Sequence, residues 1–185
     1  IAGKPYNPSE NTLYKTENYL VSFFGRLNYT LMDRYLFTVT LRNDGSSRFA
    51  KDNRWGLFPS AAFAWKVKEE SFLKDVDVLD DFKVRLGYGV TGQQEGAMIG
   101  DYSYFASYTP NSQGAYYPII GNGITYKPNA YNKDLTWEKT TTYNAGIDLA
   151  FFNNRLTANV DYYYRKTEDL LNEVYVSAGT NFAAK

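Results

Sequence analysis

The chain has 185 residues, no net charge at pH 7, and neither cysteine nor histidine. A balanced charge gives no indication of nucleic acid or another polyanion as a partner, and the missing residue types exclude disulfides, Cys/His zinc sites and a Ser-His-Asp triad. No apolar run reaches the ~18 residues of a membrane-spanning helix, and residues 1–10 lack the pattern of a signal peptide.

The first predicted elements are two long strands joined by a short link. From Tyr19 to Leu31 every second residue is apolar or glycine, and the alternation restarts at Tyr35 after Met32–Arg34. Alternation with a period of two indicates β-strands, and so short a link requires an antiparallel hairpin. We expect these strands over Asn18–Met32 and Arg34–Asn43.

The middle of the chain predicts two further strands. A polar loop, Asp44–Arg54, precedes a strand over Trp55–Val67, in which Pro59 predicts a local irregularity. Residues Lys68–Asp81 indicate a short helical turn; its adjacent acids are typical of a solvated connection. A fourth strand is expected over Phe82–Gly92.

A long segment, Gly92–Leu135, separates these strands from the last ones. Its glycines, asparagines, prolines, serines and tyrosines indicate a loop, and so long a loop is uncommon unless it is functional. Two strands are expected after it, over Thr136–Phe151 and Arg155–Lys166, joined by a tight turn at Asn153-Asn154. Residues 172–179 suggest a seventh strand.

Strand length and loop asymmetry indicate the fold class. The predicted strands have about ten to fifteen residues, whereas strands of globular proteins average five or six. Tight turns and long loops alternate along the chain, so they fall at opposite ends of the sheet. The sequence predicts an all-β fold, an antiparallel up-and-down transmembrane β-barrel segment of about six to seven long strands, with short periplasmic turns and long extracellular loops. A soluble antiparallel sandwich has the same alternation and remains an alternative.

In a barrel, one side-chain phase faces lipid and the other faces the lumen. Aromatic residues near strand ends suit the interfacial girdles: Trp55, Trp65, Tyr35, Tyr88 and Trp137. Charged residues of the inward phase are expected to pair across strands or to contact a plug: Arg26, Arg42, Lys83, Arg85, Asp148, Asp161 and Arg165.

Two motifs are candidate sites. Gly87–Gly92 is a GxGxxG pattern, but no helix follows it, so its glycines indicate close packing rather than a dinucleotide site. The long loop carries aromatic rings that suit sugars and peptides, or that pack the loop against itself or a lid. These candidate contact residues are Tyr102, Tyr104, Phe105, Tyr108, Tyr116 and Tyr117. No catalytic, cofactor-binding or metal-binding residue is predicted, and we expect no enzyme.

Four blocks of sequence resemble one known family. They are SFFGRLNYTLMDRYLFTVTLRNDGSSRF, NRWGLFPSAAFAWKVKEESFL, LDDFKVRLGYGVTGQ and LTWEKTTTYNAGIDLAFFNNRLTANVDYYYRKTEDLL. In this order they are similar to the barrel of SusC/RagA-type TonB-dependent outer-membrane transporters, over most of Asn18–Leu171.

The resemblance implies a large barrel in the bacterial outer membrane, surrounded by lipid and crossed by many strands. It implies import of oligosaccharides or peptides, driven by a TonB complex, with a SusD-like surface lipoprotein over the mouth. We expect residues 1–185 to be part of the barrel domain without a plug, with 92–135 as an extracellular loop. Because single-chain barrels need at least eight strands, we expect a segment of a larger barrel. The alternative is a soluble or surface β-sandwich that binds glycans through its aromatic loop.

Overall fold

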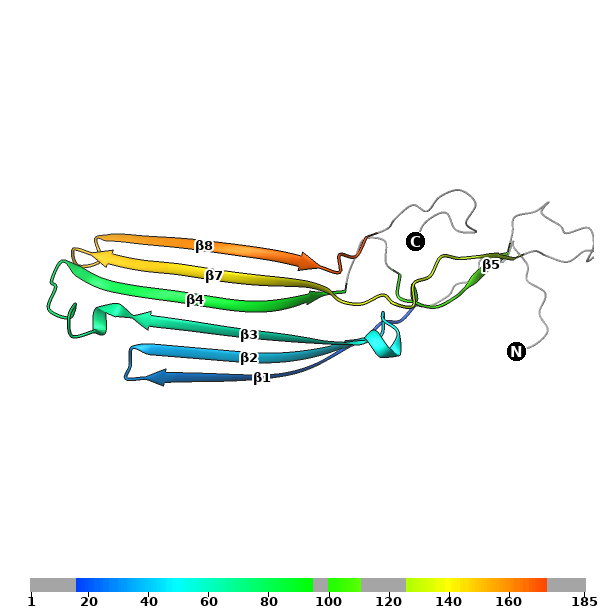
Figure 1. The fold of residues 1–185 in the computed structure, drawn as a ribbon, viewed down its shortest axis with the longest axis horizontal. Coiled ribbons are helices and arrows are strands. Elements are labelled where there is room, and N and C mark those ends of the chain that lie inside the picture. Colours follow the sequence, from blue (N-terminus) through cyan, green and yellow to red (C-terminus); the bar gives the residue numbers. More distant parts are fainter. Residues whose placement is uncertain (1–15, 95–99, 111–125, 173–185) are drawn as a thin grey trace, which may run out of the picture.

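The computed structural model describes residues 16–94, 100–110 and 126–172. Six long strands form one antiparallel sheet in the order β1-β2-β3-β4-β7-β8, so each strand pairs with its neighbour in this series (Figure 1). The predicted up-and-down arrangement is therefore confirmed, and the suggested seventh strand lies almost entirely outside the described residues. The strands are β1 (Leu20–Leu31), β2 (Tyr35–Ser46), β3 (Trp55–Lys66), β4 (Leu79–Gln93), β7 (Glu138–Phe151) and β8 (Leu156–Glu168), with a small separate hairpin of β5 (Tyr108–Pro110) and β6 (Tyr126–Pro128).

Both tight turns use left-handed backbone conformations. Met32 and Asp33 have φ angles of 51° and 55°, and the Arg34 N–H donates to the Leu31 carbonyl oxygen at 3.2 Å. The turn at 152–155 repeats this, with φ angles from 57° to 60° over its first three residues. Turns with positive φ match the right-handed twist of paired strands, so they allow a direct return of the chain.

Short and long connections lie at opposite ends of the sheet (Figure 1). One end, which we call the turn end, holds the turns at 32–34 and 152–155 and the connection 67–78. The loop end, at the opposite side, holds the loop 47–54 with the 3-10 helix η1 (Lys51–Asn53). It also holds the described stretches 100–110 and 126–137 of the long connection. The helical turn expected in Lys68–Asp81 is present only at the start of this range, as the short 3-10 helix η2 (Val67–Glu69). Strand β4 begins earlier than predicted, at Leu79.

The strand register separates the two side-chain phases into two faces. One row of paired residues reads Leu27, Val39, Ala61, Tyr88, Tyr143 and Tyr164 across the six strands. We call this apolar side the outward face and the opposite side the inward face. Many large apolar side chains of the outward face are exposed, including Leu27, Val39 and Tyr164. Within the described ranges, no helix is long and apolar enough to cross a membrane.

The irregularity predicted at Pro59 is present on one side of β3. Pairing with β2 continues through Leu41 and Pro59, but pairing with β4 ends at Ser60 and Gly89. Proline has no N–H to donate to a neighbouring strand, so Pro59 favours the end of pairing between β3 and β4. Beyond it, β3 and β4 separate toward the loop end.

A polar anchor holds the connection 67–78 at the turn end. Glu70 accepts hydrogen bonds from Arg34 at 2.8 Å, from the Tyr35 hydroxyl at 2.6 Å and from Trp65 Nε1 at 3.0 Å. These donors hold the pKa of the Glu70 carboxyl below its ordinary value, chiefly through the Tyr35 hydroxyl. The interpretation of Glu70 as part of a merely solvated connection was therefore incomplete.

Candidate functional site

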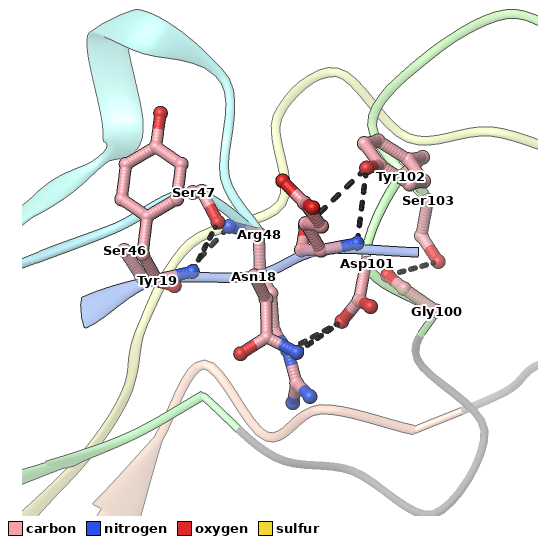
Figure 2. Close-up of polar contacts among 10 residues, drawn as sticks. Asn18, Tyr19, Ser46, Ser47, Arg48, Gly100, Asp101, Tyr102 and Ser103 are labelled. Carbon is pink, nitrogen blue, oxygen red and sulfur yellow. Dashed lines mark hydrogen bonds and ion pairs between the residues drawn. The ribbon is translucent and has the colours of Figure 1, made fainter. Parts of the chain in front are cut away.

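Three chain segments meet at the loop end around Asp101. Its Oδ1 accepts from Arg48 Nε and from Asn18 Nδ2, both at 3.0 Å, as Figure 2 shows. The side chains of Arg48 and Asp101 are 16% and 13% exposed, so the ion pair is largely shielded from water. One carboxylate thus joins the loop after β4 to the loop between β2 and β3 and to the residues before β1. We call these contacts the loop clamp.

Hydrogen bonds of backbone groups reinforce the loop clamp (Figure 2). The Tyr19 N–H donates to Ser47 Oγ at 3.0 Å, and the Ser47 N–H donates to the Tyr19 carbonyl oxygen at 3.1 Å. On the other side, the Tyr102 hydroxyl donates to the Glu17 carbonyl oxygen at 3.3 Å and accepts from the Glu17 N–H at 3.4 Å. The chain that leads into β1 is therefore fixed between two loops.

A small apolar core lies beneath the loops. Phe49, Phe58 and Trp137 are buried, with ring centroids 5.2 Å apart for Phe49–Trp137 and 5.3 Å for Phe58–Trp137. The Trp137 Nε1 donates to the Arg54 carbonyl oxygen at 3.0 Å. Trp137 is only 3% exposed, so its predicted place in an aromatic girdle is wrong. It precedes β7 and fills the space where β3 and β4 separate.

Glycines make room for this core. A methyl group at Gly92 would overlap the Phe58 ring, and one at Gly56 would crowd both Phe58 and Trp137. The close packing expected of the GxGxxG glycines is thus found at Gly92. Gly87 and Gly89 have only ordinary contacts with their neighbours.

The inward face carries an ion-pair network in the middle of the sheet. Arg85 binds Asp148 through two hydrogen bonds of 2.8 Å and reaches Asp161 at 3.0 Å. Asn159 Nδ2 also donates to Asp148, at 3.1 Å. The residues come from β4, β7 and β8, so the expected cross-strand pairing of inward charges is confirmed here. This wall is polar and hydrogen-bonded, whereas the outward face is apolar.

The predicted aromatic residues of the long loop divide into two groups. The Tyr102 hydroxyl is engaged in the loop clamp, and Tyr104 is partly buried. Phe105 and Tyr108 are 64% and 66% exposed. Tyr116 and Tyr117 lie outside the described residues. Sequence reasoning did not identify Asp101, Arg48 or Asn18, because no local pattern indicates that residues so far apart meet.

The described groups of the loop end can make binding contacts. Among the described residues, no group of three or more acidic side chains is arranged to hold a metal ion. What the loop end offers is aromatic surface, hydroxyl groups and backbone polar groups. Such a set is suited to holding a polar ligand or a protein surface.

Comparisons with known proteins all match TonB-dependent receptors. Residues 2–184 match the family profile described as TonB dependent receptor-like, beta-barrel. The TonB-dependent receptor SusC of Bacteroides thetaiotaomicron is 58% identical over 181 residues, which make up 95% of this chain and 17% of that protein. The TonB-dependent receptor P39 of Formosa agariphila is 37% identical over 185 residues, covering 97% of this chain and 17% of that protein.

Solved structures of the RagAB peptide importer are similar in fold and sequence. In the closed-closed state the TM-score is 0.75 at 31% identity, over 90% of this chain and 17% of the compared chain. In the open-open state it is 0.76 at 31% identity, over 96% and 19%. This chain therefore spans less than a fifth of the length of these proteins.

Proposed function

Because the chain belongs to the family of TonB-dependent receptor-like β-barrels, we propose that it forms part of the wall of an outer-membrane importer. The observation that carries this proposal is the two-faced sheet, apolar and exposed outward, polar and ion-paired inward. In a closed barrel the first face meets lipid and the second lines a watery lumen or packs on a plug.

The mechanism proposed for this segment is passive. Residues 1–185 supply barrel wall, turns and loops, and residues 92–135 an extracellular loop. Energy enters through a TonB complex, and the segment itself performs no covalent chemistry. The Arg85 network stabilises the wall by pairing charges that would otherwise face the lumen alone.

The substrate class is an oligosaccharide or a peptide, which the exposed aromatic rings of the long loop would contact. Phe105 and Tyr108 are the better candidates, because the Tyr102 hydroxyl is already bonded within the loop clamp. One relative structure is described as a peptide importer, which supports the peptide class. A SusD-like lipoprotein would cover the same mouth, so these rings would serve either contact.

The soluble sandwich alternative lacks support in the described part of the chain. A sandwich requires a second sheet over the apolar face. The other sheet in the described ranges is the β5–β6 hairpin, with three residues per strand, which is too small to cover six long strands.

Fractionation of the cell envelope tests the proposal. An antibody against the loop Gly92–Leu135 should detect a band several times heavier than 21.2 kDa, in the outer membrane and released only by detergent. A band near the mass of this chain in a soluble fraction would overturn the proposal.

A further inference from the structure

We infer that the outward face binds one molecule of lipid A, with an acyl chain in a groove between side chains and a phosphate at two lysines beside it. This inference rests on the proposed function, since it requires the outward face to meet the bilayer.

The groove has a volume of about 520 Å³ and is lined mainly by apolar residues of the outward face. It exists because small side chains lie between large ones. Ala61 lies between Val39 and Tyr88 in one row, and Ala145 lies between Leu86 and Tyr162 in the next. A smooth wall would contact lipid uniformly, whereas a recess of this kind can hold a single chain along its length.

Tyrosine rings border the groove on the side of the loop end. Tyr88, Tyr143 and Tyr164 pair in one row, with ring centroids 5.3 Å and 6.4 Å apart. Tyrosines of this kind concentrate where apolar chains give way to headgroups, because the ring is apolar and the hydroxyl is polar. The row therefore marks the level at which the headgroup of a bound lipid would begin.

Two lysines lie directly beyond the tyrosine row on the same face. Thr141 pairs with Lys166 in the next row, and Lys139 pairs with Glu168 in the row after it. Lys166 Nζ binds Glu168 Oε1 at 2.6 Å, so the two ammonium groups and one carboxylate leave one positive charge. All three side chains are exposed. An anionic headgroup is the ligand that complements this charge.

The position along the strand identifies the leaflet. The outward phase of β8 is apolar from Leu156 to Tyr164 and turns charged at Lys166. Nine residues are about what a tilted strand needs to cross a bilayer, so the lysines lie at its boundary. Long loops lie outside the cell, so this boundary belongs to the outer leaflet. Lipid A is the lipid of that leaflet that carries both phosphate and several acyl chains.

The test uses the complete transporter that carries this segment, purified in detergent, stripped of lipid and titrated with monophosphoryl lipid A in native mass spectrometry. We expect one retained lipid. The double substitution K139Q/K166Q should weaken its affinity about tenfold, since it removes two charge-assisted contacts. Ala61→Leu, which fills the groove, should weaken it as well. Lys74→Gln removes an exposed lysine at the turn end and should leave binding unchanged.

Folding of each variant is checked by heat-modifiable migration on gels. Equal affinity of folded K139Q/K166Q and the parent would overturn the inference, and so would equal weakening by Lys74→Gln or equal retention of phosphatidylcholine. Failure of the proposed function looks different, because the parent protein would then be absent from the outer membrane. A correctly located, folded transporter that ignores lipid A contradicts only the lipid site.

Discussion

At the scale of single residues, two carboxylates organise the opposite ends of the sheet. Glu70 accepts three hydrogen bonds at the turn end, and Asp101 accepts two at the loop end. Each joins segments that neighbouring strands do not hold together. Their charge assists the hydrogen bonds, which makes them stronger than neutral ones.

The lowered pKa of Glu70 predicts that the connection 67–78 becomes less stable in acid. The folded pKa of its carboxyl is lowered, so its contribution to stability is complete above the ordinary carboxyl pKa of about 4.3. The contribution is lost as the pH falls through the lowered folded value. Hydrogen exchange of residues 67–78, corrected for intrinsic rates, should quicken on acidification. Glu70→Gln should exchange faster at pH 7 and lose this dependence on pH.

Glu69→Gln is the matched control, because the Glu69 side chain is exposed next to Glu70. It should behave like the parent at every pH. If Glu69→Gln and Glu70→Gln changed exchange equally, the three donors would not account for the anchor.

Asp101 predicts a loop that loosens without its charge. Asp101→Asn keeps the size of the side chain but removes the ion pair with the largely shielded Arg48. We expect the free energy that holds the loop in place to fall by about 1 to 3 kcal/mol. Limited proteolysis of the purified transporter should then cut within 94–137 faster. Asp52→Asn, an exposed acid at the same end, should not change the cleavage rate; a similar acceleration there would contradict the role of the clamp.

At the scale of elements, the separation of β3 from β4 creates the apolar core of the loop end. Pairing stops beside Pro59, and the Phe58 ring occupies the space between the strands. Trp137 then packs on this ring at the start of β7. A defect in one ladder therefore provides the site at which the long loop is attached to the sheet.

Gly92 tests this arrangement. Gly92→Ala places a methyl group into the Phe58 ring, and we expect a loss of about 1 to 3 kcal/mol in the free energy of unfolding from overpacking. Adding Phe58→Leu should recover part of the loss. Gly89→Ala is the control on the same strand, since its methyl group would lie 3.5 Å from Ser60. Denaturant titration of the transporter in detergent measures all of them, and equal losses at Gly89 and Gly92 would exclude the overpacking explanation.

At the scale of the whole molecule, the six long strands form one sheet with an outward and an inward face. Short connections lie at one end of this sheet and long ones at the other (Figure 1). Among the described strands, β1 and β8 each pair on one side only. An unpaired edge is not tolerated within lipid, so the proposed barrel requires further strands beside both edges. In the outward phase, β3 is apolar as far as Trp55 at the loop end, and β8 is apolar as far as Tyr164.

The two ends should lie on opposite sides of the membrane. This chain has no cysteine, so single cysteines can be placed in a transporter freed of any others. Tyr108→Cys at the loop end should react with a membrane-impermeant maleimide on intact cells. Phe72→Cys, similarly exposed at the turn end, should react only after permeabilisation. Labelling of both positions on intact cells would contradict the proposed orientation.

Local sequence patterns suffice to predict the strands, their two faces and the asymmetry of their ends. Alternation, turn residues and loop length act locally, so strands such as β1 and β7 were predicted to within two residues of their bounds. The burial of Trp137, the ion pair of Asp101 with Arg48 and the three donors to Glu70 are evident from the folded structure alone. Those contacts depend on the register between strands and on the point at which pairing stops. Neither leaves a local pattern, because the partners lie far apart along the chain, as do Asn18 and Asp101 or Arg54 and Trp137, which are 83 positions apart in each case.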